Sequence, residues 1–156
     1  METEIKKIRK IVLLFITLLI ISGLTAFPIR TEINFLIVHQ SSFPIFIQNW
    51  IEQINSSIAQ TPEIVLYGTD WLAFAHIIIA LFFIGVYINP VKNKFIVLVG
   101  IIACLGVFPL AFIMGNIRGT PFFHQLIDCS FGILGIIPLY IIHKKIKDIE
   151  HANIKH

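Results

Sequence analysis

The stretch from Trp71 to Ile88, WLAFAHIIIALFFIGVYI, decides what kind of protein this chain is. It contains no Asp, Glu, Lys or Arg, and it is close to the roughly 20 residues with which a helix crosses a bilayer. A backbone in lipid must satisfy its own hydrogen bonds, so such a run is expected to be helical. Three similar apolar runs cover Ile11 to Phe27, Phe95 to Met114 and Phe122 to Ile142.

We therefore predict an all-α membrane protein, a four-helix transmembrane bundle forming a single membrane domain over 1–156. The expected spans are residues 11–28, 69–89, 95–115 and 121–143. Composition agrees, because 13% of the residues are charged and the mean hydropathy is +0.86, whereas soluble domains carry roughly 25% charged residues.

The first apolar run also has the features of a secretory signal, since it follows the basic start METEIKKIRK. Ala26 would end a weak cleavage site, but Leu24 at the −3 position is not small. We expect a retained membrane anchor, with cleavage left open as the alternative.

The basic residues gather at one side of the predicted membrane. Ten of the twelve Lys and Arg residues fall in the N-terminal tail, in the turn near residue 93 and in the C-terminal tail. They are Lys6, Lys7, Arg9, Lys10, Lys92, Lys94, Lys144, Lys145, Lys147 and Lys155. Arg30 and Arg118 fall on the other side. The positive-inside rule then predicts that both termini are cytoplasmic, and charges that flank spans argue against nucleic-acid binding.

The segment 28–69 is expected on the outer side. Its apolar residues recur at helical spacing with polar residues between them, which predicts an amphipathic outer helix. These apolar residues are Phe43, Ile47, Trp50, Ile51, Ile54 and Ile58. The helix either lies on the membrane surface, with Trp50 at the headgroups, or covers the mouth of the bundle.

Helix starts are marked by a capping hydroxyl followed by proline or an acidic residue. Thr120-Pro121 predicts that the fourth helix begins near Pro121. Thr61-Pro62 and Thr69-Asp70 offer two starts for the second helix. Pro109 and Pro138 are expected to kink the third and fourth helices.

Asp128 is the least expected residue, because a carboxylate costs on the order of 3 kcal/mol at the bilayer centre. His124 lies four residues before it and so shares its helix face. Gly132 and Gly135 continue that face, and small residues mark close helix contacts. We expect Asp128 to face the bundle and to pair with His76, His124 or Arg118.

These residues predict an outward-facing polar pocket made of Asp70, His76, Arg118, His124 and Asp128. His76 and Asp128 would lie at similar depth, each roughly 10 Å from its helix start. A structural network is the competing interpretation, in which Asp70 stabilises a helix start through the dipole and Arg118 is a loop cation.

Three functional interpretations of the pocket stay open. His76, His124 and Asp128 are weak candidates for a metal site, and His76 with His124 for binding haem b. His76 and Asp128 would also serve proton transfer, or binding of a lipid or quinone. We predict no cofactor as the default.

Other parts of the sequence favour packing over chemistry. Cys104 and Cys129 are interpreted as small buried residues at helix contacts rather than as a disulfide. Gly100, Ala103 and Gly106 are expected to allow close packing of the third helix. The chain has no CxxC, HExxH or glycine-rich phosphate loop, which favours a non-enzymatic protein.

The segments SGLTAFPIRTEINF, YGTDWLAFAHI and IRGTPFFHQLIDCSFGILG, in this order, resemble a group of small, uncharacterised four-span bacterial membrane proteins. The resemblance implies the bacterial cytoplasmic (inner) membrane and no particular activity or site residue. We expect a small polytopic accessory or structural subunit. Its partners would be the lipid bilayer and a membrane protein or a second copy of the chain. The alternative is a binding, redox or proton-transfer protein that uses the polar pocket.

Overall fold

The computed structural model describes residues 2–154, and these residues form helices and turns without a strand. The long helices are α1 (Glu2–Ala26), α4 (Glu63–Ile88), α5 (Lys94–Pro109) and α7 (Phe122–Ile154). A π-helical turn η2 (Leu110–Met114) and α6 (Gly115–Arg118) extend α5, so that four helical runs are long and apolar enough to cross a membrane. The all-helical class with four span-length helices is confirmed, and the bundle arrangement stays a prediction. Lys155 lies outside the described residues.

Two compact units share the chain. The larger unit comprises Met1–Leu19 and Ile78–His156, and the smaller unit comprises Ile20–Ile77. The single membrane domain remains a prediction.

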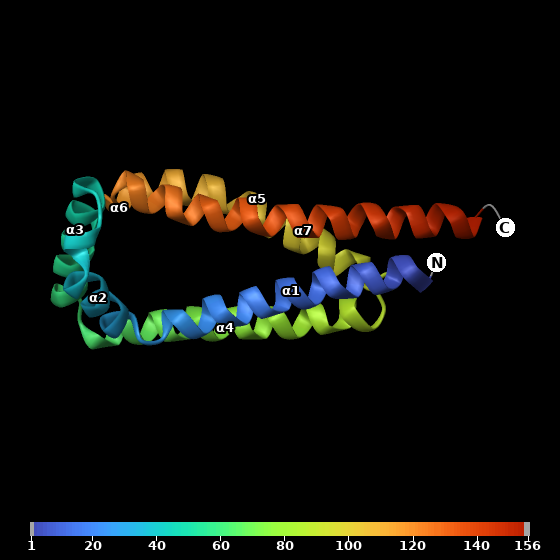
Figure 1. Cartoon of the computed structure of the whole chain (residues 1–156), viewed down its shortest axis with the longest axis horizontal. Coiled ribbons are helices and arrows are strands. Elements are labelled where there is room, and N and C mark those ends of the chain that lie inside the picture. Colours follow the sequence, from blue (N-terminus) through green and yellow to red (C-terminus); the bar gives the residue numbers. More distant parts are fainter. Residues whose placement is uncertain (1, 155–156) are drawn as a thin grey trace. The chain divides into compact units, whose positions relative to one another are not determined.

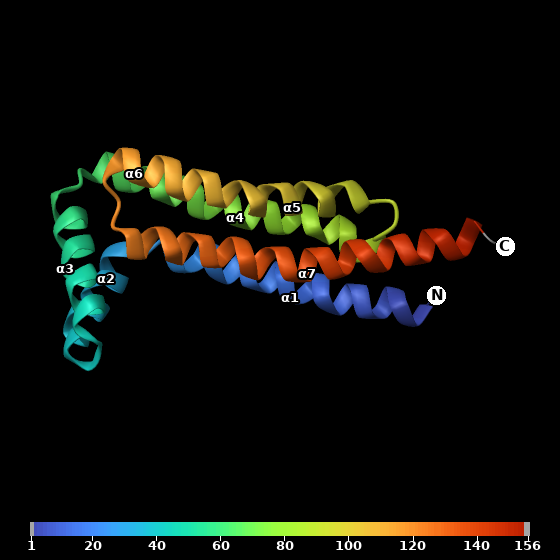
Figure 2. The same cartoon turned by 90° about the horizontal axis from the view of Figure 1, so that it is seen from above.

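In the larger unit, α5 and α7 run side by side (Figures 1 and 2). Small residues of α7 allow this close approach. A Cβ atom added to Gly132 would lie 2.9 Å from the Cys104 carbonyl oxygen, and one on Gly135 would lie 2.6 Å from the Cys104 sulfur. Cys104 therefore faces α7 as a free thiol, and Cys129 is free and buried.

The expected packing role holds for Gly100 but not for the two small residues that follow it. A Cβ on Gly100 would lie 2.9 Å from Phe83 and 3.0 Å from Leu139. Gly106 has open space around it and Ala103 is exposed, so the prediction was wrong for both. Cys104 takes the contact position because it is four residues after Gly100 and shares its helix face.

The turn between α6 and α7 is a Schellman motif. Gly119 has a φ of +68°, which only a residue without a Cβ adopts freely. The Thr120 amide donates to the Gly115 carbonyl at 2.8 Å, and the Gly119 amide donates to the Asn116 carbonyl at 3.2 Å. The next helix begins at Phe122, which confirms the start predicted near Pro121.

The two prolines behave differently from each other. Pro109 is the last residue of α5, and the π-helical turn η2 follows it directly. Such turns arise where the regular helical hydrogen bonds are interrupted, and proline interrupts them because it has no backbone N–H. α7 continues as one helix through Pro138.

The smaller unit contains two further helices and a short 3₁₀ turn. α2 (Ile29–Val38), η1 (Gln40–Ser42) and α3 (Ile45–Gln60) occupy the segment predicted to lie outside the membrane. α2 contacts α3, and Ile33 of α2 and Ile51 of α3 are both buried. The sequence pattern located α3 but did not indicate α2, and the membrane contact of α3 stays a prediction.

In the same unit α1 and α4 approach closely at Gly23. A Cβ on Gly23 would lie 2.7 Å from the Ala73 carbonyl oxygen. α4 begins at Glu63, so the first of its two predicted starts is the helix start.

Candidate functional site

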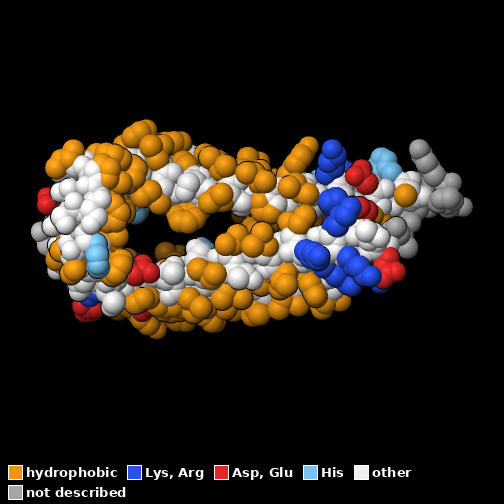
Figure 3. Space-filling model, in the orientation of Figure 1, with side chains coloured by type: hydrophobic (Ala, Val, Ile, Leu, Met, Phe, Trp, Pro, Cys, Tyr) orange, Lys and Arg blue, Asp and Glu red, His pale blue; other side chains and the backbone are white. Residues whose placement is uncertain are grey.

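Apart from Arg118, the described cationic side chains of the larger unit gather at the end where α1 begins and α7 ends (Figure 3). We call this group the basic end. Its described members are Lys6, Lys7, Arg9, Lys10, Lys92, Lys94, Lys144, Lys145 and Lys147.

Arg9 of the basic end joins α1 to the last turn of α4. Its Nε donates to the Tyr87 carbonyl at 2.9 Å and its Nη2 to the Ile88 carbonyl at 3.0 Å. The guanidinium carbon also lies 5.7 Å from the centre of the Tyr87 ring. Carbonyls in the last turn of a helix have no partner within the helix, so Arg9 satisfies two of them.

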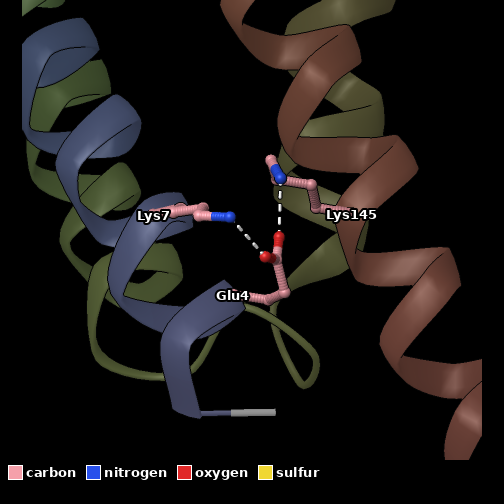
Figure 4. Close-up of polar contacts among 3 residues, drawn as sticks. All are labelled: Glu4, Lys7 and Lys145. Carbon is pink, nitrogen blue, oxygen red and sulfur yellow. Dashed lines mark hydrogen bonds and ion pairs between the residues drawn. The ribbon is translucent and has the colours of Figure 1, made fainter.

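Glu4 is held between two lysines of the basic end (Figure 4). Lys145 Nζ donates to Oε2 at 2.6 Å and Lys7 Nζ donates to Oε1 at 2.7 Å. Glu4 precedes the apolar run of α1. The hydrogen bonds from Lys145 and then Lys7 lower the pKa of Glu4 from 4.5 to about 2. A second ion pair, Lys94 Nζ to Glu150 Oε1 at 2.6 Å, joins α5 to α7.

The five residues of the predicted polar pocket divide between the two units. Asp70 and His76 belong to the smaller unit, and Arg118, His124 and Asp128 belong to the larger one. A pocket formed by all five therefore stays a prediction.

Within the larger unit, His124 and Asp128 are brought together. His124 Nε2 lies 3.9 Å from Asp128 Oδ1, and the side chains are 36% and 43% exposed. Arg118 is exposed at the last turn of α6 and forms no ion pair within residues 2–154. The suggested Arg118–Asp128 pair is thus not formed, and Arg118 sits where a cation interacts favourably with the helix dipole.

His76 obtains its hydrogen bond from its own helix. Its Nδ1 lies 2.8 Å from the Leu72 carbonyl oxygen. A carbonyl oxygen can only accept, so Nδ1 is the donor of this hydrogen bond. His76 was singled out in the sequence because a histidine in an apolar run needs a hydrogen-bond partner. Leu72 of the same helix supplies one, so no second helix is needed for this bond.

Asp70 lines a cavity in the smaller unit, which we call the Asp70 cavity. Its volume is about 380 Å³, and it lies between the start of α2 and the first turns of α4. Its polar lining comes from Arg30, Thr31, Glu63, Tyr67, Thr69 and Asp70. Asp70 stands about two turns after the start of α4, so it is not the dipole-stabilised residue at a helix start that the sequence suggested.

Arg30 and Glu63 form the ion pair of this cavity, with Nη2 and Oε1 2.7 Å apart. Sequence reasoning missed both residues, because they are 33 positions apart and nothing local links them. Arg30 had been noted as a rare cation on its side of the membrane, which was the signal that pointed to it.

Gln125 of α7 was also missed. It is 2% exposed, and its Nε2 donates to the Thr120 carbonyl at 2.8 Å and to Asn116 Oδ1 at 3.2 Å. Its Oε1 is buried with no hydrogen-bond partner among the described residues. A Cβ on Gly115 would lie 2.8 Å from Gln125, so this glycine makes room for the amide. An amide inside the apolar run FFHQLID was the available signal.

Across residues 2–154, no group of three or more His, Cys, Asp or Glu side chains is arranged to hold a metal ion. No family model matches the chain, and no curated protein or solved structure matches it either.

Proposed function

We propose that this chain is a small polytopic integral membrane protein that serves as a non-enzymatic accessory or structural subunit. The supporting observation is that charged side chains at the basic end join one helix to another. Arg9, Glu4 and Glu150 each contact a second helix, so these charges stabilise helix association. The long helices expose large apolar side chains, which suit contact with lipid and with other transmembrane helices.

The proposal includes a location and an orientation. The chain would lie in the bacterial cytoplasmic membrane, with the basic end and both termini in the cytoplasm. Reporter fusions after Lys94 and at the C-terminus should be active as cytoplasmic reporters, and a fusion after Gln60 as a periplasmic one. An active periplasmic reporter at the C-terminus would contradict the orientation.

A partner subunit is tested with a photo-crosslinking residue on α5. Ile102 is 59% exposed and Val97 is fully buried, so the two positions form a matched pair on one helix. Irradiation of intact cells should give one protein adduct of defined mass from position 102 and none from position 97. Lipid adducts alone from position 102, and from other exposed positions of α5, would contradict the accessory role. An adduct of twice the chain mass would identify a second copy as the partner.

A second candidate function is binding, redox or proton transfer with a lipid, quinone, haem b or metal at an outer polar site. The Asp70 cavity favours its binding form, because a cavity of about 380 Å³ lies within the size range of small-molecule sites. An absorption spectrum and a lipid extract of the purified protein would separate these ligand classes.

A further inference from the structure

We propose that the Asp70 cavity binds a zwitterionic headgroup that carries an ammonium and a phosphate, as in phosphatidylethanolamine. The inference rests on the second candidate function, in which this cavity binds a ligand. It names the chemical class of that ligand and the residues that recognise it.

The first argument is the charge left over in the cavity. Arg30 and Glu63 neutralise each other at 2.7 Å. Asp70 accepts no hydrogen bond and forms no ion pair among the described residues, although it is only partly exposed. A partly desolvated carboxylate without a partner is costly, and an ammonium group that donates to it removes that cost.

The second argument is the capacity of Arg30 for an anion. A guanidinium has five N–H donors, and the contact with Glu63 uses one of its nitrogens, Nη2. The remaining donors match phosphate oxygens, which arginine binds in a fork geometry. One ligand with both charges therefore fits the cavity better than an isolated cation or anion.

The third argument is the position of the cavity at the end of two apolar runs. Phe27 closes the apolar run of α1, and the apolar run of α4 starts at Trp71, next to Asp70. The Tyr67 and Trp71 rings meet edge to face with centroids 6.1 Å apart. Aromatic residues of this kind mark the headgroup level of a membrane. Phe27 and Leu66 give the cavity an apolar wall where acyl chains begin.

The test measures binding to the purified full-length chain in detergent. The probes are short-chain phosphatidylethanolamine, short-chain phosphatidylglycerol, which has the phosphate but no ammonium, and soluble glycerophosphoethanolamine. Binding is followed by Trp fluorescence and by the shift in unfolding temperature. We expect phosphatidylethanolamine to bind about tenfold more tightly than phosphatidylglycerol, and Asp70→Asn to reduce that ratio to about one.

Three further variants make the result specific. Asp70→Glu should keep the preference because it keeps the charge, and Glu52→Gln, on an exposed position of α3, should leave it unchanged. Glu63→Gln should strengthen binding of both lipids, since it frees Arg30 for the phosphate. If Asp70→Asn does not fold, Asp70→Ser replaces it.

The outcomes separate the inference from the function on which it rests. Lipid binding without a headgroup preference, or a preference that survives Asp70→Asn, would overturn the inference and leave a binding cavity. No binding of any probe would overturn both. Equal affinity for glycerophosphoethanolamine and the lipid would keep the recognised chemistry and identify a soluble ligand as its source.

Discussion

At the basic end of the larger unit, Glu4 accepts hydrogen bonds from two lysines, whereas in the smaller unit Asp70 accepts none from any described residue. Both carboxylates lie near one end of an apolar run, so their location does not explain the difference. Glu4 has side chains of two helices around it, and Asp70 has an open cavity. The comparison teaches that a carboxylate paired with a side chain of another helix stabilises helix association. A carboxylate that lines a cavity without such a partner is available to bind a ligand.

The largest expected effect is a loss of stability in the smaller unit on replacing Gly23. It tests whether close helix packing stabilises this unit as it does the larger one. Gly23→Ala would place a Cβ 2.7 Å from the Ala73 backbone oxygen, so the helices must separate. We expect a loss of about 1–3 kcal/mol, measured by thermal unfolding in detergent. Gly106→Ala is the matched control, because open space surrounds it, and it should raise stability by up to about 1 kcal/mol. Equal effects of the two changes would show that α1 and α4 do not pack at Gly23.

The second effect concerns the most specific contact of the basic end. Arg9→Gln removes a cation that donates to the Tyr87 and Ile88 carbonyls, and should cost about 1–2 kcal/mol. Lys10→Gln removes an exposed charge of the same sign and should change stability little. The measurement is chemical unfolding of both variants in the same detergent. If both cost the same, Arg9 would act through net charge and not as a helix cap.

A smaller effect is expected from pH, because the Glu4 ion pair is partly exposed. The pKa of Glu4 in the folded chain is about 2, below its usual 4.5. The carboxylate therefore stabilises the fold fully above about pH 4.5, and this contribution is lost as the pH falls toward 2.

Glu4→Gln should lower the unfolding temperature above pH 5 and should remove part of its fall between about pH 4.5 and 2. Glu2→Gln is the control, since Glu2 pairs with Lys6 of the same helix and with no other residue in the described part of the chain. An unchanged acid limb in Glu4→Gln would mean that Glu4 does not join α1 to α7 in solution.

The smallest effect is expected for His124 and Asp128. Their atoms are 3.9 Å apart and both side chains are partly exposed, so the coupling should be about 0.3–0.5 kcal/mol. A double-mutant cycle with His124→Gln and Asp128→Asn measures it, and a cycle with Arg118→Gln should be additive. A coupling above about 1 kcal/mol would contradict this expectation, and would show that the pair stabilises the fold as the ion pairs of the basic end do.

Composition and spacing were sufficient for the four long helices, since apolar runs near 20 residues and proline-marked starts are local signals. Pro121 located the start of α7, and the pattern from Ile47 to Ile58 located α3. Helix α2 was missed although Ile29, Ile33 and Ile37 recur at helical spacing, because the helix is only ten residues long.

The site was harder to predict because its contacts are remote in sequence. Arg30 and Glu63 form an ion pair although they are 33 positions apart, and Arg9 bonds the Tyr87 carbonyl although these residues are 78 positions apart. His76 was overrated, since a polar side chain in a helix can use the carbonyl of its own previous turn. Asp70 lines a cavity with residues other than those predicted with it, so its role in the predicted polar pocket stays a prediction.

The bond between Lys145 and Glu4 joins residues 141 positions apart, whereas α5 and α7 are neighbours along the chain. Contacts between sequence neighbours need little loop closure and form early, and a contact between residues 141 positions apart forms only after Lys145 has been synthesised. The α5–α7 hairpin is thus expected to form before the contact between α1 and α7. The Glu4–Lys145 bond is then the last of these contacts to form. A nascent chain that stops before Lys145 therefore lacks this bond between α1 and α7, and α1 should be more accessible to proteases.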